Sequence, residues 1–229
     1  MSDPELLAEQ TAYYRARASE YDQWFLRTGR YDRGPDHRQQ WNRELDQIRE
    51  TVKALGPFSN ALEIACGTGL WTGLLADLSE SLTALDSVEE TLELNRAKHP
   101  GTEIDFKAVD VFQWEPTNTY DLIFFGFWLS HVPATQFERF WRIVNQALAP
   151  GGRVFFVDSL KTQRSTARNH QALDDSGVVE RQLNNGRSFR IVKRFYEPVA
   201  LTADLRSMGW MGRVQTTEEF FLFGSFRRD

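Results

Sequence analysis

The most informative segment of the chain reads Ala61-Leu62-Glu63-Ile64-Ala65-Cys66-Gly67-Thr68-Gly69-Leu70-Trp71-Thr72. In it an apolar run breaks into a Gly-x-Gly turn, and a helical pattern follows. The next apolar run ends at Asp86, nineteen positions after Gly67. Glycines let a ligand approach the backbone closely, and a carboxylate at this spacing suits the hydroxyls of a ribose. The segment therefore predicts a strand, a tight turn and a helix that together bind a nucleoside cofactor.

The spacing of the glycines argues against a dinucleotide cofactor. A dinucleotide fingerprint needs G-x-G-x-x-G, with the pyrophosphate on the helix N-terminus. Here Thr72 stands where the third glycine is required, and Gly73 comes one position late. Glu63 also lies close to the turn, where an acid suits a cofactor without phosphates. A nicotinamide dehydrogenase is therefore disfavoured.

From residue 58 to residue 160, short apolar runs typical of strands alternate with helical stretches. Such alternation is typical of a parallel sheet with right-handed helical crossovers. The run Leu122-Ile123-Phe124-Phe125 is apolar throughout, as expected for a strand that is covered on both faces. The predicted strands are 60–65, 81–86, 104–109, 121–126 and 153–158, and the predicted helices are 70–79, 88–98 and 135–148.

The segments on either side of this region carry patterns of their own. Residues 4–26 are rich in helix formers, and a second amphipathic helix is predicted from Pro35 to the Gly56-Pro57 stop. After residue 160 the sequence predicts a hairpin around Asn184-Asn185-Gly186, a helix over 199–208 and a last strand over 219–223. We therefore expect one domain over 1–229, with a helical lid (1–57), a cofactor-binding core (58–160) and a C-terminal hairpin, helix and strand (161–229).

The pattern Glu-x-x-x-Gly-x-Gly at 63–69, followed by Asp86, resembles the S-adenosylmethionine (SAM) site of class I methyltransferases. Residues 58–160 as a whole are similar to the small-molecule type of that family, such as the methyltransferases of ubiquinone and menaquinone biosynthesis. The resemblance implies an α/β, Rossmann-like sheet of seven strands in the order 3-2-1-4-5-7-6. Its last strand would be antiparallel, helices would cover both faces, and the N-terminal helices would form a lid.

The resemblance also implies a role for each residue of the cofactor site. Gly67 and Gly69, with Ala65, would admit the methionine part of SAM, and Glu63 would lie near its ammonium group. An ionised Asp86 would accept hydrogen bonds from both ribose hydroxyls. The contacts with adenine would come from Ser87 and Val88 and from Asp110, Val111 and Phe112, although Asp110 could instead cap a turn.

The predicted strand over 121–126 is followed by a segment that should border the reacting methyl group, because open α/β sheets bind ligands beyond the carboxyl ends of their strands. Gly126 would give clearance. Phe127 and Trp128 could face the sulfonium, or simply pack. His131 is the candidate catalytic base because histidine titrates near neutrality, and a positioning hydrogen bond is the alternative role.

Aromatic side chains of the predicted lid are candidates for the remaining contacts. Tyr14 and Tyr21 could reach the carboxylate of SAM, or only pack, since they share a helix face with Phe25. The expected substrate-pocket residues are Tyr31, Trp24, Phe127 and Trp128. These aromatic residues favour an apolar or aromatic methyl acceptor.

The charge of the chain is uneven. Its net charge of −5 argues against a nucleic-acid partner, whose phosphates would need neutralisation. Residues 58–160 carry 14 acids and 6 bases, whereas residues 161–229 carry 8 acids and 12 bases. The basic excess lies mostly between Lys161 and Arg194. This segment could be a solvated connector, or some of its arginines could face an anionic substrate.

These patterns favour methyl transfer from SAM, with S-adenosylhomocysteine (SAH) as product, to an oxygen or nitrogen of a small molecule by in-line displacement. A non-catalytic SAM-binding regulatory protein and a nucleic-acid methyltransferase remain as alternatives. No segment suits membrane insertion, and the single Cys66 fits a reducing cytoplasm. No metal-ligand spacing occurs, so no metal is expected. A monomer and a homodimer are both possible.

Overall fold

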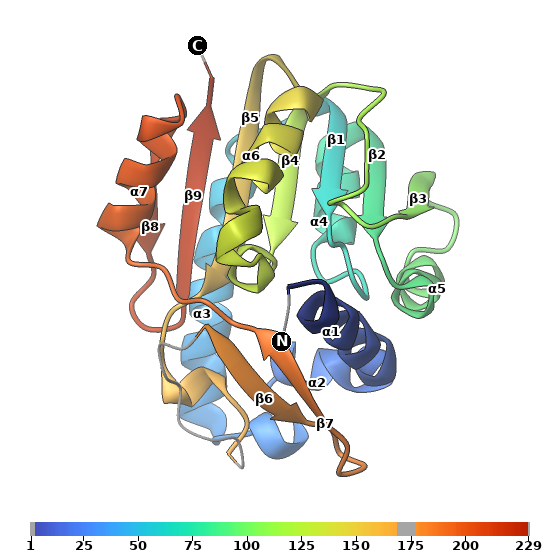
Figure 1. Cartoon of the computed structure of the whole chain (residues 1–229), viewed down its shortest axis with the longest axis vertical. Coiled ribbons are helices and arrows are strands. Elements are labelled where there is room, and N and C mark those ends of the chain that lie inside the picture. The colour runs from blue at the N-terminus through green and yellow to red at the C-terminus, as the bar shows by residue number, and fades with distance from the viewer. Residues whose placement is uncertain (1–2, 169–176, 229) are drawn as a thin grey trace.

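Seven strands form one sheet in the order β3-β2-β1-β4-β5-β9-β8 in the computed structural model, which describes residues 3–168 and 177–228 (Figure 1). Numbered within this sheet alone, the order is 3-2-1-4-5-7-6, as the family resemblance implied. The strands from β3 to β5 run parallel, and β9 is antiparallel to both of its neighbours. The strands are β1 (Phe58–Ile64), β2 (Ser79–Asp86), β3 (Ile104–Ala108), β4 (Tyr120–Gly126), β5 (Leu148–Ser159), β8 (Met211–Thr216) and β9 (Phe221–Arg227).

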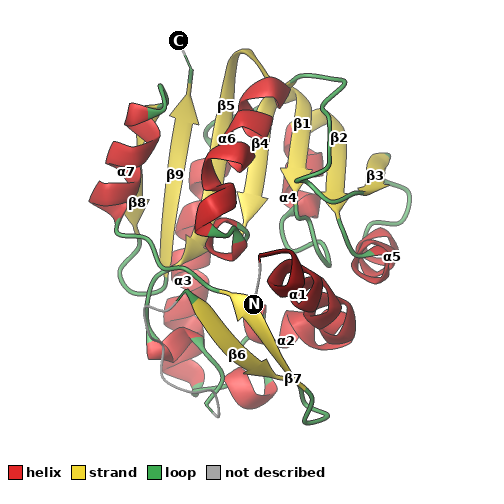
Figure 2. Cartoon of the chain, viewed as in Figure 1, coloured by secondary structure: helices red, strands yellow, loops and turns green. Residues whose placement is uncertain are grey.

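Helices cover both faces of the sheet (Figure 2). Along β4, Ile123 and Phe125 pack into one apolar core, whereas Leu122 and Phe124 pack into the other. All four side chains are fully buried, which explains why this strand is apolar throughout. The helices are α3 (Pro35–Lys53), α4 (Thr72–Leu78), α5 (Glu89–Lys98), α6 (Phe137–Ala147) and α7 (Pro198–Ser207).

Two further helices and a separate hairpin lie beyond the carboxyl ends of the parallel strands (Figure 1). They are α1 (Asp3–Arg17), α2 (Tyr21–Phe25), and the antiparallel pair β6 (Val178–Gln182) and β7 (Ser188–Val192). We call these four elements the lid; α3, which the sequence prediction included in the lid, packs its buried face into a core of the sheet. Tyr13 of α1 packs on Phe189 of β7, with ring centroids 5.7 Å apart. On the other side of the lid, Thr68 of the glycine turn donates a hydrogen bond to Asp22 of α2 at 2.6 Å.

Three sequence-based boundaries need correction. The single helix predicted over 4–26 is two helices separated by a 3₁₀ turn at Ala18–Glu20. Strand β5 begins at Leu148 rather than 153, with a register shift opposite it between Tyr120 and Leu122. The last strand, predicted over 219–223, is β9 and runs from Phe221 to Arg227. The hairpin predicted around Asn184-Asn185-Gly186 is present, and it forms a sheet of its own. None of the described helices is long and apolar enough to cross a membrane.

Candidate active site

A cavity of about 710 Å³ lies at the carboxyl ends of β1, β2, β3 and β4, and we call it the strand-end cavity. Parallel α/β sheets bind ligands at this edge. The lid contributes to the same lining through Tyr14 of α1 and Tyr21 of α2. The residues predicted for the cofactor that line this cavity are Ala65, Gly67, Asp86, Ser87, Asp110, Val111, Gly126, Tyr14 and Tyr21.

Asp86 ends β2, and backbone N–H groups fix both of its carboxylate oxygens. Gly67 donates to Oδ2 at 2.8 Å, and Val88 donates to Oδ1 at 2.9 Å. Burial raises the pKa of Asp86, while these two hydrogen bonds oppose the rise because they stabilise the ionised form. A carboxylate has about four acceptor sites, so Asp86 keeps acceptor capacity for hydroxyl groups in the cavity.

The two glycines of the turn, Gly67 and Gly69, have different surroundings. Gly67 has φ of 52°, and a Cβ atom added there would meet nothing within 4 Å. A Cβ atom added at Gly69 would instead collide with the side chain of Asn95, so a glycine is needed there to make room for Asn95. Gly69 does not line the cavity. Ala65 and Phe127 line the cavity with positive φ values of 54° and 57°. Such backbone strain costs about 1–3 kcal/mol per residue and is concentrated at functional sites.

Glu63, which was expected near the ammonium group of the cofactor, does not line the cavity. Its side chain is 2% exposed and accepts a hydrogen bond from Oγ1 of Thr72 at 2.6 Å. Burial raises the pKa of Glu63 to about 8. The carboxyl group is therefore mostly neutral at pH 7, and its direct contact with the cofactor stays a prediction. Phe112 is also outside the lining, with its ring 6.1 Å from that of Trp128.

A second cavity of about 590 Å³ adjoins the first and is lined by the lid, and we call it the lid cavity. The two cavities share Tyr14, Tyr21, Phe127 and His131. A ligand in one cavity would therefore meet a ligand in the other across these four side chains. Of the expected substrate-pocket residues, Tyr31, Trp24 and Phe127 line the lid cavity, whereas Trp128 lines the strand-end cavity.

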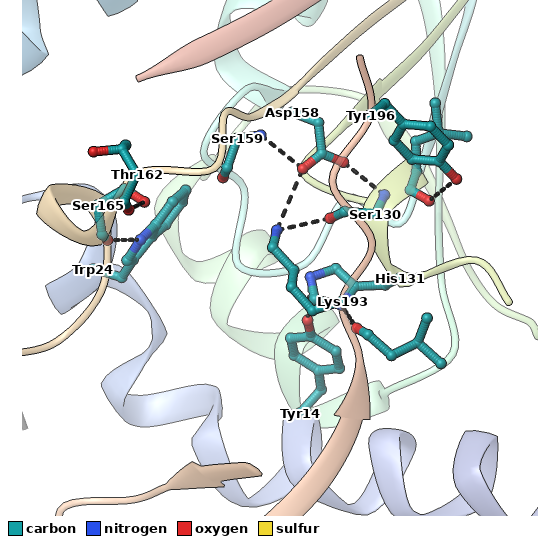
Figure 3. A network of polar contacts seen from close by, with 12 residues as sticks. Tyr14, Trp24, Ser130, His131, Asp158, Ser159, Thr162, Ser165, Lys193 and Tyr196 are labelled. Carbon is teal, nitrogen blue, oxygen red and sulfur yellow. Dashed lines mark hydrogen bonds and ion pairs between the residues drawn. The ribbon is translucent and has the colours of Figure 1, made fainter. Parts of the chain in front are cut away.

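His131 joins the sheet to the lid (Figure 3). Its Nδ1 lies 2.7 Å from the carbonyl oxygen of Val192, which can only accept, so Nδ1 carries the hydrogen. Nε2 is then the acceptor for the hydroxyl of Tyr14 at 2.9 Å. Burial, followed by the nearby charge of Lys193, lowers the pKa of His131 well below its usual value. The imidazole is therefore neutral at pH 7, with its free lone pair directed at Tyr14.

Asp158 and Lys193 form a buried ion pair beside His131 (Figure 3). Lys193 Nζ lies 3.4 Å from Oδ1 of Asp158 and donates a hydrogen bond to Oγ of Ser130 at 2.8 Å. The backbone N–H groups of Ser130 and Ser159 also donate to this carboxylate, at 2.8 and 2.7 Å. Asp158 thus receives three donors, and it fixes Lys193 at the wall of the lid cavity.

Three cations of the lid cavity were not predicted as site residues: Arg17, Arg181 and Lys193. For Arg181 and Lys193 the sequence indicated only a basic segment, with two possible roles. For Arg17 the helical spacing was a usable signal, because it lies three positions after Tyr14 and four before Tyr21. Within residues 3–168 and 177–228, no group of three or more His, Cys, Asp or Glu side chains could hold a metal ion.

Comparison with known proteins gives matches over the core and over the whole chain. A family model described as a methyltransferase domain matches residues 61–152. Ubiquinone biosynthesis O-methyltransferase of Xanthomonas axonopodis pv. citri (strain 306) is 26% identical over 169 residues, which are 72% of this chain and 67% of that protein. Nodulation protein S of Rhizobium tropici is 32% identical over 106 residues, which are 45% of this chain and 44% of that protein. The matched stretch thus spans less than half of the second relative.

Solved structures extend the similarity to nearly the full length. DhpI, in a complex with SAH and in a complex with SAM and HEP, is 36% identical, with TM-scores of 0.79 and 0.80. These matches cover 99% of this chain and 98% and 100% of the DhpI chains. The N-methyltransferase NodS from Bradyrhizobium japonicum WM9 in complex with SAH is 20% identical, with a TM-score of 0.58 over 96% of this chain and 98% of its own, and shows the shared fold.

The cavity at the strand ends fits SAM by its own chemistry. It offers an open backbone at Gly67 and a fixed carboxylate with spare acceptor sites at Asp86. The sheet order, this cavity, the methyltransferase domain match and the full-length similarity agree. The chain therefore belongs to the class I SAM-dependent methyltransferases of the small-molecule type, and SAM is its cofactor.

Proposed function

We propose that the protein methylates an oxygen or nitrogen atom of a small molecule that binds in the lid cavity. The observation that supports this assignment is the shared wall of Tyr14, Tyr21, Phe127 and His131 between the two cavities. SAM bound in the strand-end cavity would supply an electrophilic methyl group, which the acceptor atom takes as the methyl–sulfur bond breaks and leaves its electron pair on sulfur. The protein's contribution is mainly alignment, and alignment alone can lower such a barrier by several kcal/mol.

The residues of the strand-end cavity would divide the binding of SAM among them. Asp86 would accept hydrogen bonds from the ribose, and the open face at Gly67 would admit the methionine part. Ser87 and Val88 flank the same cavity, as do Asp110 and Val111, and we assign these four residues to the adenine. Tyr14 and Tyr21 of the lid would close the cavity and exclude water.

A neutral acceptor must also lose a proton, and Tyr14 and His131 are placed to take it. Nε2 of His131 faces the Tyr14 hydroxyl, and both side chains line the lid cavity. We propose that the acceptor gives its proton to the Tyr14 oxygen while the Tyr14 proton moves to Nε2. In this arrangement His131 acts through Tyr14 and makes no direct contact with the acceptor.

Titration calorimetry with SAH tests the cofactor site. Asp86→Ala should weaken SAH binding at least tenfold, because an acceptor of charge-assisted hydrogen bonds is lost. Asp77→Ala, which removes an exposed carboxylate of α4, is the matched control and should bind SAH like the wild type. Equal affinities of the wild type and Asp86→Ala would contradict the assignment.

A turnover measurement completes this test. Incubation with methyl-labelled SAM and a pool of small metabolites should release SAH and label an oxygen or nitrogen of one of them. Binding of SAM without any labelled product would favour the regulatory alternative. Label appearing in RNA or DNA, with a steep dependence on salt, would favour a nucleic-acid methyltransferase.

A further inference from the structure

We propose that the methyl acceptor is a small oxyanion, whose carboxylate or phosphoryl group binds among Arg17, Arg181 and Lys193 in the lid cavity. This inference rests on the proposed function, since it gives the class of molecule that the same site would bind. The three cations come from the end of α1, from β6 and from the residue that follows β7. No aspartate or glutamate belongs to the lining among the described residues.

The guanidinium group of Arg17 is buried and has few hydrogen-bonding partners among the described residues. Its side chain is 8% exposed, and its guanidinium carbon lies 4.8 Å from the ring centroid of Tyr21. One guanidinium nitrogen lies 3.4 Å from the hydroxyl of Tyr31, and Nε has no hydrogen-bond partner. Across the part of the chain that the structure describes, Arg17 forms no ion pair. A buried donor left without a partner is unfavourable, and more so when it is charged, so a ligand acceptor here would be favoured.

Arg181 repeats this pattern from the opposite side of the cavity. Its exposed fraction is also 8%. The one hydrogen bond of its side chain within the described residues is a long one, at 3.4 Å, to the carbonyl oxygen of Glu180. No described carboxylate lies within ion-pairing distance of it. Two guanidinium groups from different elements therefore line one small cavity, with no counter-charge among the described residues.

Lys193 adds a third positive group, whose charge is shared with Asp158. The pair is separated by 3.4 Å, and the Asp158 carboxylate already accepts two backbone N–H bonds. Counting Lys193 and Asp158 as one neutral pair leaves two charges, those of Arg17 and Arg181, that no described residue compensates. This count matches a doubly charged phosphoryl group better than a singly charged carboxylate. Arginine is also the side chain best suited to bind either group with paired N–H donors.

The position of these cations makes the anion an acceptor and not a remote effector. The lid cavity that contains them adjoins the strand-end cavity through Tyr14, Tyr21, Phe127 and His131. An anion held there would lie next to the site assigned to the transferable methyl group. Trp24 and Phe127 still offer apolar surface for the rest of the molecule. The aromatic lining that favoured an apolar acceptor would thus hold the body of an acceptor whose other end is charged.

Three probes with the same ring separate charge from aromatic character: phenyl phosphate, benzoate and benzyl alcohol. Each is titrated into the SAH-saturated protein at pH 7.5 and constant ionic strength. We expect phenyl phosphate to bind most tightly, benzoate less tightly and benzyl alcohol at least tenfold more weakly than phenyl phosphate. Arg17→Gln and Arg181→Gln should each raise the dissociation constant of both anions about tenfold and leave those of SAH and benzyl alcohol unchanged.

Arg187→Gln is the matched control, because Arg187 lies on the same hairpin, is exposed and does not line the cavity. It should bind the anions like the wild type. Tighter binding of benzoate than of phenyl phosphate would identify the oxyanion as a carboxylate. The inference would be overturned if benzyl alcohol bound as tightly as the anions, or if Arg187→Gln weakened anion binding as much as Arg17→Gln and Arg181→Gln do. In either case, intact SAH binding would leave the proposed function standing. Failure of SAH itself to bind would overturn both.

Discussion

Glu63 shows how burial changes the meaning of a residue that the sequence pattern emphasises. The pattern places an acid close to the glycine turn, and such an acid is expected to be ionised. In the fold Glu63 lies inside β1, 2% exposed, with Thr72 of α4 as its hydrogen-bond donor. Desolvation is the largest influence on this carboxyl group and raises its pKa to about 8. Glu63 thus serves as a neutral partner of Thr72 near pH 7.

The free energy of unfolding should therefore depend on Glu63. The folded protein holds a proton on Glu63 up to about pH 8, whereas the unfolded chain releases it near pH 4.5. The stability due to this proton is complete below about pH 4.5 and falls by about 1.4 kcal/mol per pH unit between the two values. Glu63→Gln should remove this slope. Its unfolding temperature, measured by thermal unfolding, should therefore rise relative to that of the wild type as pH rises from 5 to 8. Parallel pH dependences of the two proteins would contradict the assignment.

The pair of Tyr14 and His131 gives a second prediction. The Tyr14 hydroxyl donates to Nε2 of His131, and this hydrogen bond stabilises the neutral imidazole. Tyr14→Phe should therefore raise the pKa of His131, which NMR titration of the imidazole nitrogens measures. Tyr196→Phe is the control, because its hydroxyl bonds to the Leu129 carbonyl and does not touch the imidazole. An unchanged His131 pKa in Tyr14→Phe would show that the two side chains are uncoupled.

Individual site residues were predictable where the motif lies within one element or at its end. Asp86 and Gly67 are linked by a fixed spacing along a strand–turn–helix unit, and the structure joins them by a hydrogen bond. His131 was identified from its position after β4, but its partners were not. Tyr14 and Val192 lie 117 and 61 positions away, and no local pattern relates them to His131.

At the scale of elements, α1 depends on the hairpin for its position. The cluster between them contains Tyr13, Phe189 and Ile191, all buried. Polar contacts reinforce it, since Gln10 bonds to the backbone of both His131 and Val192. A helix held mainly by one apolar cluster can open locally without unfolding of the sheet.

Phe189→Ala should release α1 selectively. Loss of a buried phenylalanine costs about 3–5 kcal/mol, and here the cost falls on the contact between α1 and β7. Hydrogen exchange should accelerate in residues 3–17 and 188–192 while β1 and β4 stay protected. Leu205→Ala in α7 is the control, because Leu205 is fully buried and its helix packs on the edge strand β8. Similar exchange patterns in both variants would show that the lid has no separate stability.

The elements themselves differed in how clearly the sequence marked them. Strands β4 and β5 carry unbroken apolar runs, at 122–125 and 154–157, since both faces of the sheet are covered there. Strand β8 was not located, because it lies at the sheet edge and Val214 is its only buried side chain. Its Gly212 is required by packing, since an added Cβ atom would collide with the backbone of Ser225. Close approach of two strands leaves no periodic signal in the sequence.

At the scale of the whole molecule, the two cavities draw on different parts of the chain. The strand-end cavity is built mostly from residues 64–132, over which the motif spacing is local. The lid cavity combines Arg17 with Arg181 and Lys193, which are more than 160 positions away in sequence. The cofactor was therefore predictable from one segment. The class of acceptor depends on contacts between the two ends of the chain, which only the folded lid brings together.

Because α1 contributes Tyr14 to both cavities, SAH and the acceptor should bind cooperatively. Each ligand requires the same helix to be docked, so the ligand that binds first orders it for the second. We expect saturating phenyl phosphate to tighten SAH binding at least fivefold, and thermodynamic reciprocity requires SAH to tighten phenyl phosphate binding by the same factor. Calorimetry in both orders measures this coupling free energy. Independent binding would contradict this coupling and would show that α1 is already fixed in the free protein.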